Sequence, residues 1–100
     1  MEYSEIQKNK TNRIGGDNMF HKIKKVIPKE NLIIEVEFEN KIKKEYDINK
    51  VIKKWTVFEK LKNNELFNKV KVDVGGYGIS WDENIDLSCE EIWQNGEKID

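Results

Sequence analysis

The chain has 100 residues, of which 37% are apolar and 37% are charged, and its 18 basic side chains are balanced by 19 acidic ones. This length fits one small domain with a thin core, and the balanced charge and 10% aromatic content favour a folded domain over a disordered chain. A single cysteine excludes an internal disulfide and a paired-cysteine zinc or redox site, and no apolar run approaches the roughly 20 residues of a membrane span, so we expect a cytoplasmic protein.

Residues 1–18 show neither helical nor strand periodicity and include a Gly-Gly pair, so we expect a disordered tail. Residues 15–18, Gly-Gly-Asp-Asn, are what a purine-rich ribosome-binding sequence would encode, which motivates the hypothesis that translation starts at Met19. One domain is expected at residues 19–95, followed by a flexible C-terminus at residues 96–100.

Three segments predict an antiparallel meander. Residues 20–27 favour a strand that ends at Pro28, which cannot continue a central ladder. Residues 32–39 alternate apolar side chains with glutamates, and residues 42–47 follow after a tight turn. Glutamates and lysines are expected to pair across the solvent face of this hairpin.

Short helices are expected next. Asp47 or Asn49 can cap the first helix, and Thr56 can cap a second one. Their apolar positions predict helices packed on one face of the sheet, which gives a small two-layer α+β fold.

The last third of the chain returns to strand patterning. Residues 70–74 and 79–81 predict two strands, the second being the last, joined by a glycine-rich turn at 75–78 with positive φ. Ser88 and Glu91 fit a capping box that opens a final short helix.

Catalytic or ligand-binding patterns are weak. His21 is the only histidine and has no partner nearby in sequence, so an exposed strand histidine is expected. Cys89 is expected to be packed and inert, because Glu90 and Glu91 oppose a lowered thiol pKa.

Two acidic or glycine-rich stretches resemble ligand loops without completing them. Residues 82–86 begin like a calcium loop, but Leu87 and Trp93 stand where glycine and glutamate are needed. Residues 75–78 lack the context of a phosphate loop. Because nothing specifies a carboxylate pair for acid–base catalysis either, we expect no enzymatic activity, no metal and no cofactor.

Charge is uneven along the chain. Residues 73–100 hold eight acids and one lysine, whereas residues 1–72 hold 17 bases and 11 acids, which predicts opposite poles. The basic middle of the chain contains the candidate nucleic-acid contacts, Lys41, Lys43, Lys44, Lys50, Lys53 and Lys54. Sequence-specific DNA binding is not favoured, because arginine is absent from the expected domain.

Large aromatic side chains in the acidic part can serve either as packing or as interface anchors. On the second interpretation the candidate partner-binding residues are Tyr77, Trp81, Asp82, Asp86 and Trp93.

Several stretches together carry a family resemblance: IKKVIP at 23–28, VEFEN at 36–40, YDI at 46–48, KWTVFEKL at 54–61, ELF at 65–67 and VDVGGYGISWDENIDLSCEEIW at 72–93. From residue 19 to about residue 95 the chain resembles the bacterial domain-of-unknown-function family twenty-four forty-two. Thr56, where related sequences often have proline, and the leading tail depart from its pattern. The resemblance implies a small α+β fold and no established activity, and it transfers no catalytic residues. Similar members are often encoded beside a small partner and discussed as halves of toxin–antitoxin modules.

We therefore expect a protein-interaction module, antitoxin-like or accessory in a two-gene bacterial system, with its partner encoded by a neighbouring gene. The alternative is a nucleic-acid-associated regulator that uses the lysine-rich middle of the chain.

Overall fold

The computed structural model describes residues 20–99, so the expected tail and the proposed start at Met19 lie outside the described residues. The elements follow in the order β1 (Ile23–Pro28), η2 (Glu30–Leu32), β2 (Ile33–Phe38), β3 (Lys43–Asp47), α1 (Ile48–Lys54), η3 (Thr56–Lys62), α2 (Asn64–Phe67), β4 (Lys71–Val72), η4 (Val74–Gly76), β5 (Gly78–Asp82), β6 (Ile85–Ser88), α3 (Cys89–Asn95) and β7 (Glu97–Ile99). Of the three η segments, η3 is 3₁₀-helical, whereas η2 and η4 are turns that contain residues with positive φ, Asn31 and Gly75.

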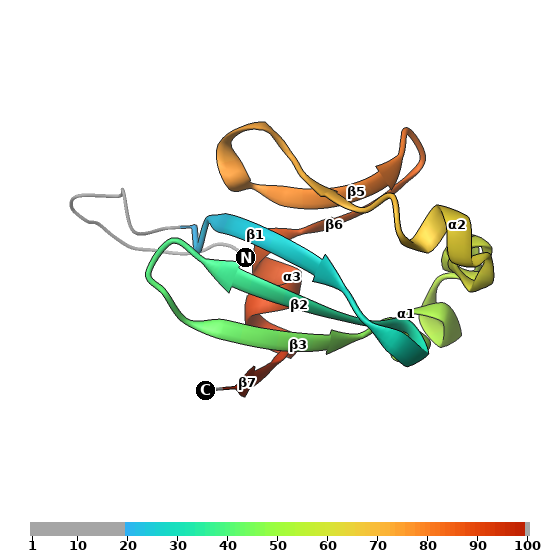
Figure 1. Ribbon diagram of the computed structural model, residues 1–100, viewed down its shortest axis with the longest axis horizontal. Helices are drawn as coiled ribbons and strands as arrows, with labels where there is room; N and C mark the ends of the chain where they lie inside the picture. Colours follow the sequence, from blue (N-terminus) through green and yellow to red (C-terminus); the bar gives the residue numbers. More distant parts are fainter. Residues whose placement is uncertain (1–19, 100) are drawn as a thin grey trace.

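The larger sheet contains the predicted meander. Its strands are antiparallel in the order β1-β2-β3-β7. Along β2, Ile34, Val36 and Phe38 are fully buried, and the glutamates between them are half-exposed. Figure 1 shows α3 behind these strands, and Trp93 on α3 packs its ring edge-on against Phe38. The two-layer α+β prediction is therefore confirmed.

The opposite face of this sheet is charged, as the hairpin pattern predicted. Glu37 lies directly across from Lys43 on β3 and next to Lys25 on β1. Opposite charges in such cross-strand positions stabilise a sheet modestly, by about 0.2–1 kcal/mol for each pair.

A second, three-stranded sheet has the order β4-β5-β6. The prediction that residues 79–81 form the last strand is wrong, because Ile85 and Leu87 also point into the core and form β6. β4 and β1 belong to different sheets but lie against each other, so the second sheet extends the core beyond the edge of the first (Figure 1).

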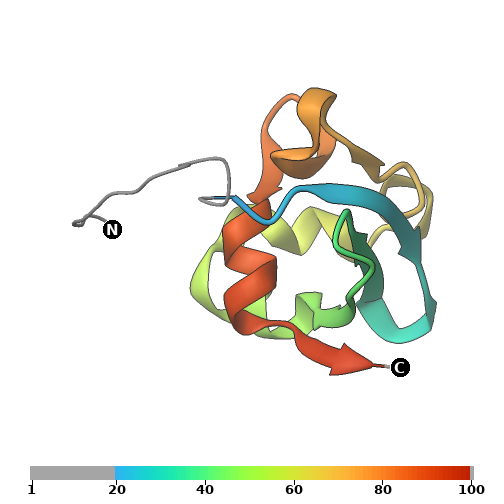
Figure 2. The same cartoon turned by 90° about the vertical axis from the view of Figure 1, so that its left-hand side faces the viewer.

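The C-terminal residues also form a strand where a flexible end was predicted. Gly96 ends α3 with its N–H donating to the Ile92 carbonyl, and the chain then turns back along β3, where Glu97–Ile99 pairs with Lys43–Glu45. Figure 2 shows α3 leading into β7. The backbone groups at the free edge of β3 hydrogen-bond to residues 97–99. Because β3 is distant in the sequence, the local pattern around these residues did not predict a strand.

Helix capping follows the sequence in part. Asp47 caps α1 by accepting from the Asn49 N–H at 2.9 Å, as predicted. The prediction for Thr56 is wrong: it is the first residue of the 3₁₀ segment η3, whose N-cap position is Trp55 with no side-chain hydrogen bond. Asn63 instead caps the short helix α2.

The buried side chains form one hydrophobic cluster that joins both sheets and the helices. It includes Val36 from the larger sheet, Ile79 and Leu87 from the smaller one, and Ile92 from α3. Between residues 20 and 99 no helix has the length and apolar character that a membrane crossing needs.

The acidic C-terminal part packs against the basic middle of the chain. Helix α3 packs on β3. Strand β7 pairs with β3, so that Glu97 faces Glu45 and Lys98 faces Lys44. Elements of the acidic C-terminal part therefore lie beside a strand of the basic part, and the opposite poles stay a prediction.

Candidate functional site

Trp81, one of the predicted partner contacts, lies in the core. Its side chain is only 4% exposed, and its indole N–H donates to the Phe67 carbonyl at 3.2 Å. The ring also packs edge-on against Phe58. Trp81 therefore has no surface to offer a partner, and the packing interpretation of this residue is correct.

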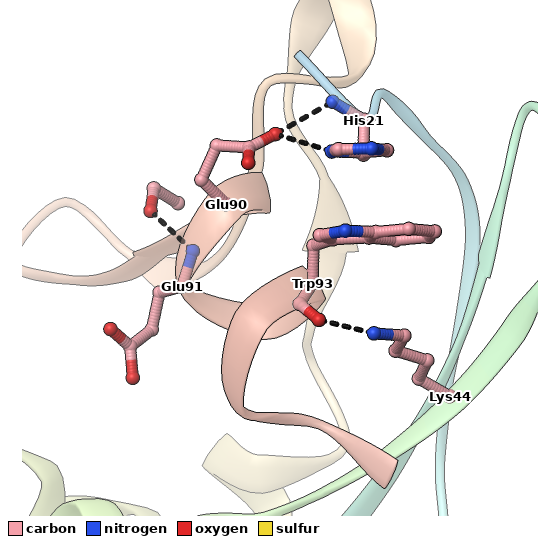
Figure 3. A network of polar contacts seen from close by, with 6 residues as sticks. His21, Lys44, Glu90, Glu91 and Trp93 are labelled. Carbon is pink, nitrogen blue, oxygen red and sulfur yellow. Dashed lines mark hydrogen bonds and ion pairs between the residues drawn. The ribbon is translucent and has the colours of Figure 1, made fainter. Parts of the chain in front are cut away.

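Trp93 is half-buried and held from both sides (Figure 3). The His21 ring stacks on the indole with centroids 3.8 Å apart and planes within 5°. On the other side, the Lys44 ammonium lies 4.1 Å from the indole centroid and donates to the Trp93 carbonyl. The contact joins a cation to an aromatic face, which is attractive. Trp93 thus fastens α3 to the start of β1 and to β3.

His21 is not the exposed strand histidine that the sequence predicted. It precedes β1, and its backbone N–H donates to Glu90 Oε2 at 2.7 Å while its Nδ1 lies 3.0 Å from the same oxygen. Glu90 is in the first turn of α3. The partner 69 residues away could not be read from the local pattern around His21.

One end of the molecule carries three exposed apolar side chains, Phe20, Val74 and Tyr77, which we call the apolar end. Phe20 is 51% exposed, Tyr77 49% and Val74 99%. The rings of Phe20 and Tyr77 meet edge-to-face with centroids 5.4 Å apart, and the Lys22 ammonium lies 5.3 Å from the Tyr77 centroid.

The turn that presents Val74 depends on its two glycines. Gly75 and Gly76 have φ values of 85° and 81°, in the region that disfavours side chains, so the predicted positive-φ turn is confirmed. A Cβ on Gly76 would lie 2.6 Å from the Ile23 carbonyl oxygen, so the turn also requires glycine to approach β1. Asp73 supports it by accepting from Ser80 Oγ at 2.7 Å.

Asp82 and Asp86 lie apart from the apolar end. Both are exposed at the β5–β6 hairpin, where Asp82 accepts from the Asn84 N–H at 2.8 Å and so shapes the turn. Tyr77 precedes the opposite end of β5. The five predicted partner contacts therefore do not form one surface.

The predicted nucleic-acid lysines are also divided. Lys41 occupies the tip of the β2–β3 hairpin with φ of 76°, Lys43 projects from the charged face of the sheet, and Lys44 turns inward to Trp93. The remaining three, Lys50, Lys53 and Lys54, are exposed on α1. Only this last group is a local cluster.

A polar cavity of about 350 Å³ lies where α1, β3 and the C-terminal part of α3 meet. The residues that matter for its chemistry are Tyr46, Lys50, Lys54, Glu91, Asn95 and Glu97. The sequence had assigned Glu91 to a capping box. Ser88 Oγ does accept from the Glu91 N–H at 3.1 Å, but the Glu91 carboxylate accepts from Tyr46 Oη at 2.7 Å instead of returning to the helix start.

The Tyr46 hydroxyl is a hydrogen-bond donor in this arrangement. Burial, and after it the hydrogen bond to Glu91 and the Glu91 charge, raises the pKa of the Tyr46 hydroxyl well above its ordinary value of 10.0. The phenol therefore stays protonated and keeps the Glu91 carboxylate in place.

Cys89 is buried at the first position of α3. Burial, and then the neighbouring Glu90 charge, raises the thiol pKa above 9.0. The Cys89 side chain is packed in the core, as the sequence predicted. A thiol with a raised pKa is a poor nucleophile.

Sequence reasoning missed Phe20, Val74 and the polar cavity. Val74 directly precedes a glycine pair, and an apolar residue at the start of such a turn was the available signal. The cavity had no local signal, because Tyr46 and Glu91 are 45 residues apart.

The comparisons with known proteins concern nearly the whole described part of the chain. The model of a family described as "Protein of unknown function (DUF2442)" matches residues 23–98. No curated protein and no solved structure matches the chain. The match covers well over half of the sequence and agrees with the motif resemblance, so the chain belongs to the DUF2442 family.

Proposed function

We propose that this chain is a non-enzymatic protein-binding module, the antitoxin-like or accessory member of a two-gene bacterial system. Its partner is the product of a neighbouring gene and contacts the apolar end formed by Phe20, Val74 and Tyr77. Contacts of the same partner with Asp82, Asp86 and Trp93 remain predictions.

The observation that carries this proposal is Val74, which is 99% exposed on a turn closed by two backbone hydrogen bonds, from the Asp73 N–H to the Gly78 carbonyl and from the Gly76 N–H to the Asp73 carbonyl, both 2.9 Å. A side chain on a flexible loop could fold back, but this turn directs Val74 into solvent. Exposed apolar groups beside aromatic rings are typical of protein-binding sites, and aromatic side chains are enriched among residues that dominate binding energy. Preorganisation of the turn reduces the entropy lost on binding.

Co-expression with the product of each adjacent gene tests the proposal. We expect a stable complex by co-purification and calorimetry, and relief of any growth arrest that the neighbour causes alone. Failure to bind either neighbouring product would refute the partner assignment.

Paired substitutions test the surface. Val74→Asp should weaken the complex by about tenfold or more, since it places a charge at the proposed contact. Val57→Asp, at an exposed valine on η3, is the matched control and should leave affinity unchanged. Equal losses from the two variants would show that the apolar end is not the contact surface.

A nucleic-acid-associated regulator is the second candidate, favoured by one observation on α1. Trp55 is 45% exposed directly after the helix, and the Lys54 ammonium lies 5.6 Å from its ring centroid. An exposed ring beside lysines can stack on a base while the lysines bind phosphate. A salt-dependent gel shift that disappears in Lys50→Glu/Lys53→Glu would support it, and the absence of a shift at low salt would exclude it.

A further inference from the structure

We propose that the polar cavity between α1, β3 and α3 binds a small zwitterion of the α-amino acid class. This site is separate from the apolar end and does not depend on the proposed function. The inference comes from how the charges of the cavity are distributed and which of them are already paired.

The positive side of the cavity is Lys50 and Lys54 on α1. They are four residues apart in the helix, so they project from the same face. Neither ammonium has a carboxylate within ion-pair distance among residues 20–99. The Lys54 ammonium also lies 5.6 Å from the Trp55 ring centroid, but that ring leaves its charge uncancelled, so both lysines can attract an anionic group.

The negative side is Glu91 on α3. Its Oε2 accepts from Tyr46 Oη at 2.7 Å and from Asn95 Nδ2 at 3.0 Å. Both donors are neutral, so they orient the carboxylate without cancelling its charge. Oε1 accepts no hydrogen bond from the part of the chain that the structure describes. Glu97 adds a second carboxylate at the rim.

The carboxylates of the other two acids that line the cavity already have partners within the protein. Glu45 is paired with Lys29 at 3.0 Å, and Asp47 caps α1 through the Asn49 N–H. The uncompensated groups are thus two lysines on one element and two glutamates on others.

A ligand with one charge would satisfy only one side of this cavity. A zwitterion can place its carboxylate at the lysines and its ammonium at Glu91, and such charge-assisted hydrogen bonds are stronger than neutral ones. Ile33, which is partly exposed, also lines the space, so an apolar side chain has a surface to contact. A volume of about 350 Å³ lies in the usual range for small-ligand pockets.

Three related probes test the charge requirement: L-leucine, its methyl ester, which keeps only the ammonium, and N-acetyl-L-leucine, which keeps only the carboxylate. In NMR titrations of the full chain, L-leucine should give saturable shifts of amides in α1, β3 and α3. The two single-charge analogues should bind about tenfold more weakly or worse. Absence of saturable L-leucine binding, or equal binding of either analogue, would overturn the proposal.

Three substitutions test the residues. Lys54→Gln and Glu91→Gln should each weaken L-leucine binding about tenfold, and glutamine at position 91 can still accept from Tyr46. Lys53→Gln is the matched control, because it removes the same charge from α1 at a position outside the cavity lining. A loss in Lys53→Gln as large as in Lys54→Gln would show general electrostatic attraction and refute the site. Amide dispersion of each variant verifies that it is folded.

Discussion

Each tryptophan of this chain has a different environment, and so a different expected effect on stability. Trp81 is in the core, Trp93 is half-buried between His21 and Lys44, and Trp55 is 45% exposed. Loss of a large side chain costs the transfer free energy of the buried surface and, in a core, the cavity left behind.

Alanine substitution should therefore rank the three residues. We expect a loss in the free energy of unfolding of about 4 kcal/mol for Trp81→Ala, about 2 kcal/mol for Trp93→Ala and less than about 1 kcal/mol for Trp55→Ala. Urea denaturation followed by circular dichroism measures all three. If Trp93→Ala were as mild as Trp55→Ala, the stack with His21 would contribute nothing to stability.

Tyr46 makes stability depend on alkaline pH. Its pKa in the folded state is raised above 10.0, chiefly by burial and also by Glu91. As the pH rises, the unfolded chain therefore loses this proton at a lower pH than the folded chain does. The contribution is fully present below pH 10 and is lost as the pH rises toward the folded pKa. Between about pH 10 and 12 the free energy of unfolding should fall by up to about 1.4 kcal/mol per pH unit from this group.

Tyr46→Phe separates this effect from other titrations. The variant should lose about 1–3 kcal/mol at neutral pH, because the hydrogen bond to Glu91 is removed, and should show a shallower decline above pH 10. Denaturation curves across this pH range provide the measurement. An unchanged slope would mean that Tyr46 does not control the alkaline loss.

At the scale of the elements, side-chain caps determine where the short helices begin. Ser88 accepts from the Glu91 N–H at the start of α3, whereas no side-chain cap begins the 3₁₀ segment at Thr56. Helices of seven residues or fewer depend on such caps and on tertiary packing, because nucleation is costly.

Ser88→Ala and Thr56→Ala should thus lower the free energy of unfolding by different amounts. We expect a loss of about 1 kcal/mol for Ser88→Ala and less than about 0.5 kcal/mol for Thr56→Ala. Thermal or urea unfolding of the two variants decides the matter. A larger loss at Thr56 would indicate that its hydroxyl stabilises η3 in solution.

Register across the larger sheet has a consequence that the pattern within each strand did not reveal. Glu35, Glu45 and Glu97 lie side by side on β2, β3 and β7, although like charges in such positions are unfavourable. Lys29 bridges the first two, at 3.3 Å to Glu35 and 3.0 Å to Glu45. The side-chain period of two predicts which residues share a face, but the neighbour of each is decided by the pairing between strands.

On the scale of the whole molecule, one core holds two sheets together. Buried side chains of both sheets belong to the same hydrophobic cluster, and Trp81 in β5 packs against Phe58 in η3. Separating the two sheets would expose the apolar faces that they bury together in this cluster.

Unfolding should therefore occur in one cooperative step. Tryptophan fluorescence and far-ultraviolet circular dichroism should give coincident urea transitions with a single midpoint. Two separate midpoints would show that the three-stranded sheet unfolds independently of the four-stranded one.

The sequence by itself determined the family, the meander, and most of the secondary structure whose signals are local. Alternation along β2, the glycine pair at positions 75 and 76, and the caps at Asp47 and Ser88 all depend on neighbours within a few residues. Such signals survive in a single sequence because backbone geometry fixes their spacing.

Only the tertiary structure decided which distant groups meet. It buried Trp81, placed His21 on Trp93, paired β7 with β3 and joined Glu91 to Tyr46. These contacts link residues far apart in the chain, so no periodicity predicts them. The surface proposed for a partner differs from the one that the sequence predicted for the same reason. Exposure at each position depends on what the rest of the chain packs against it.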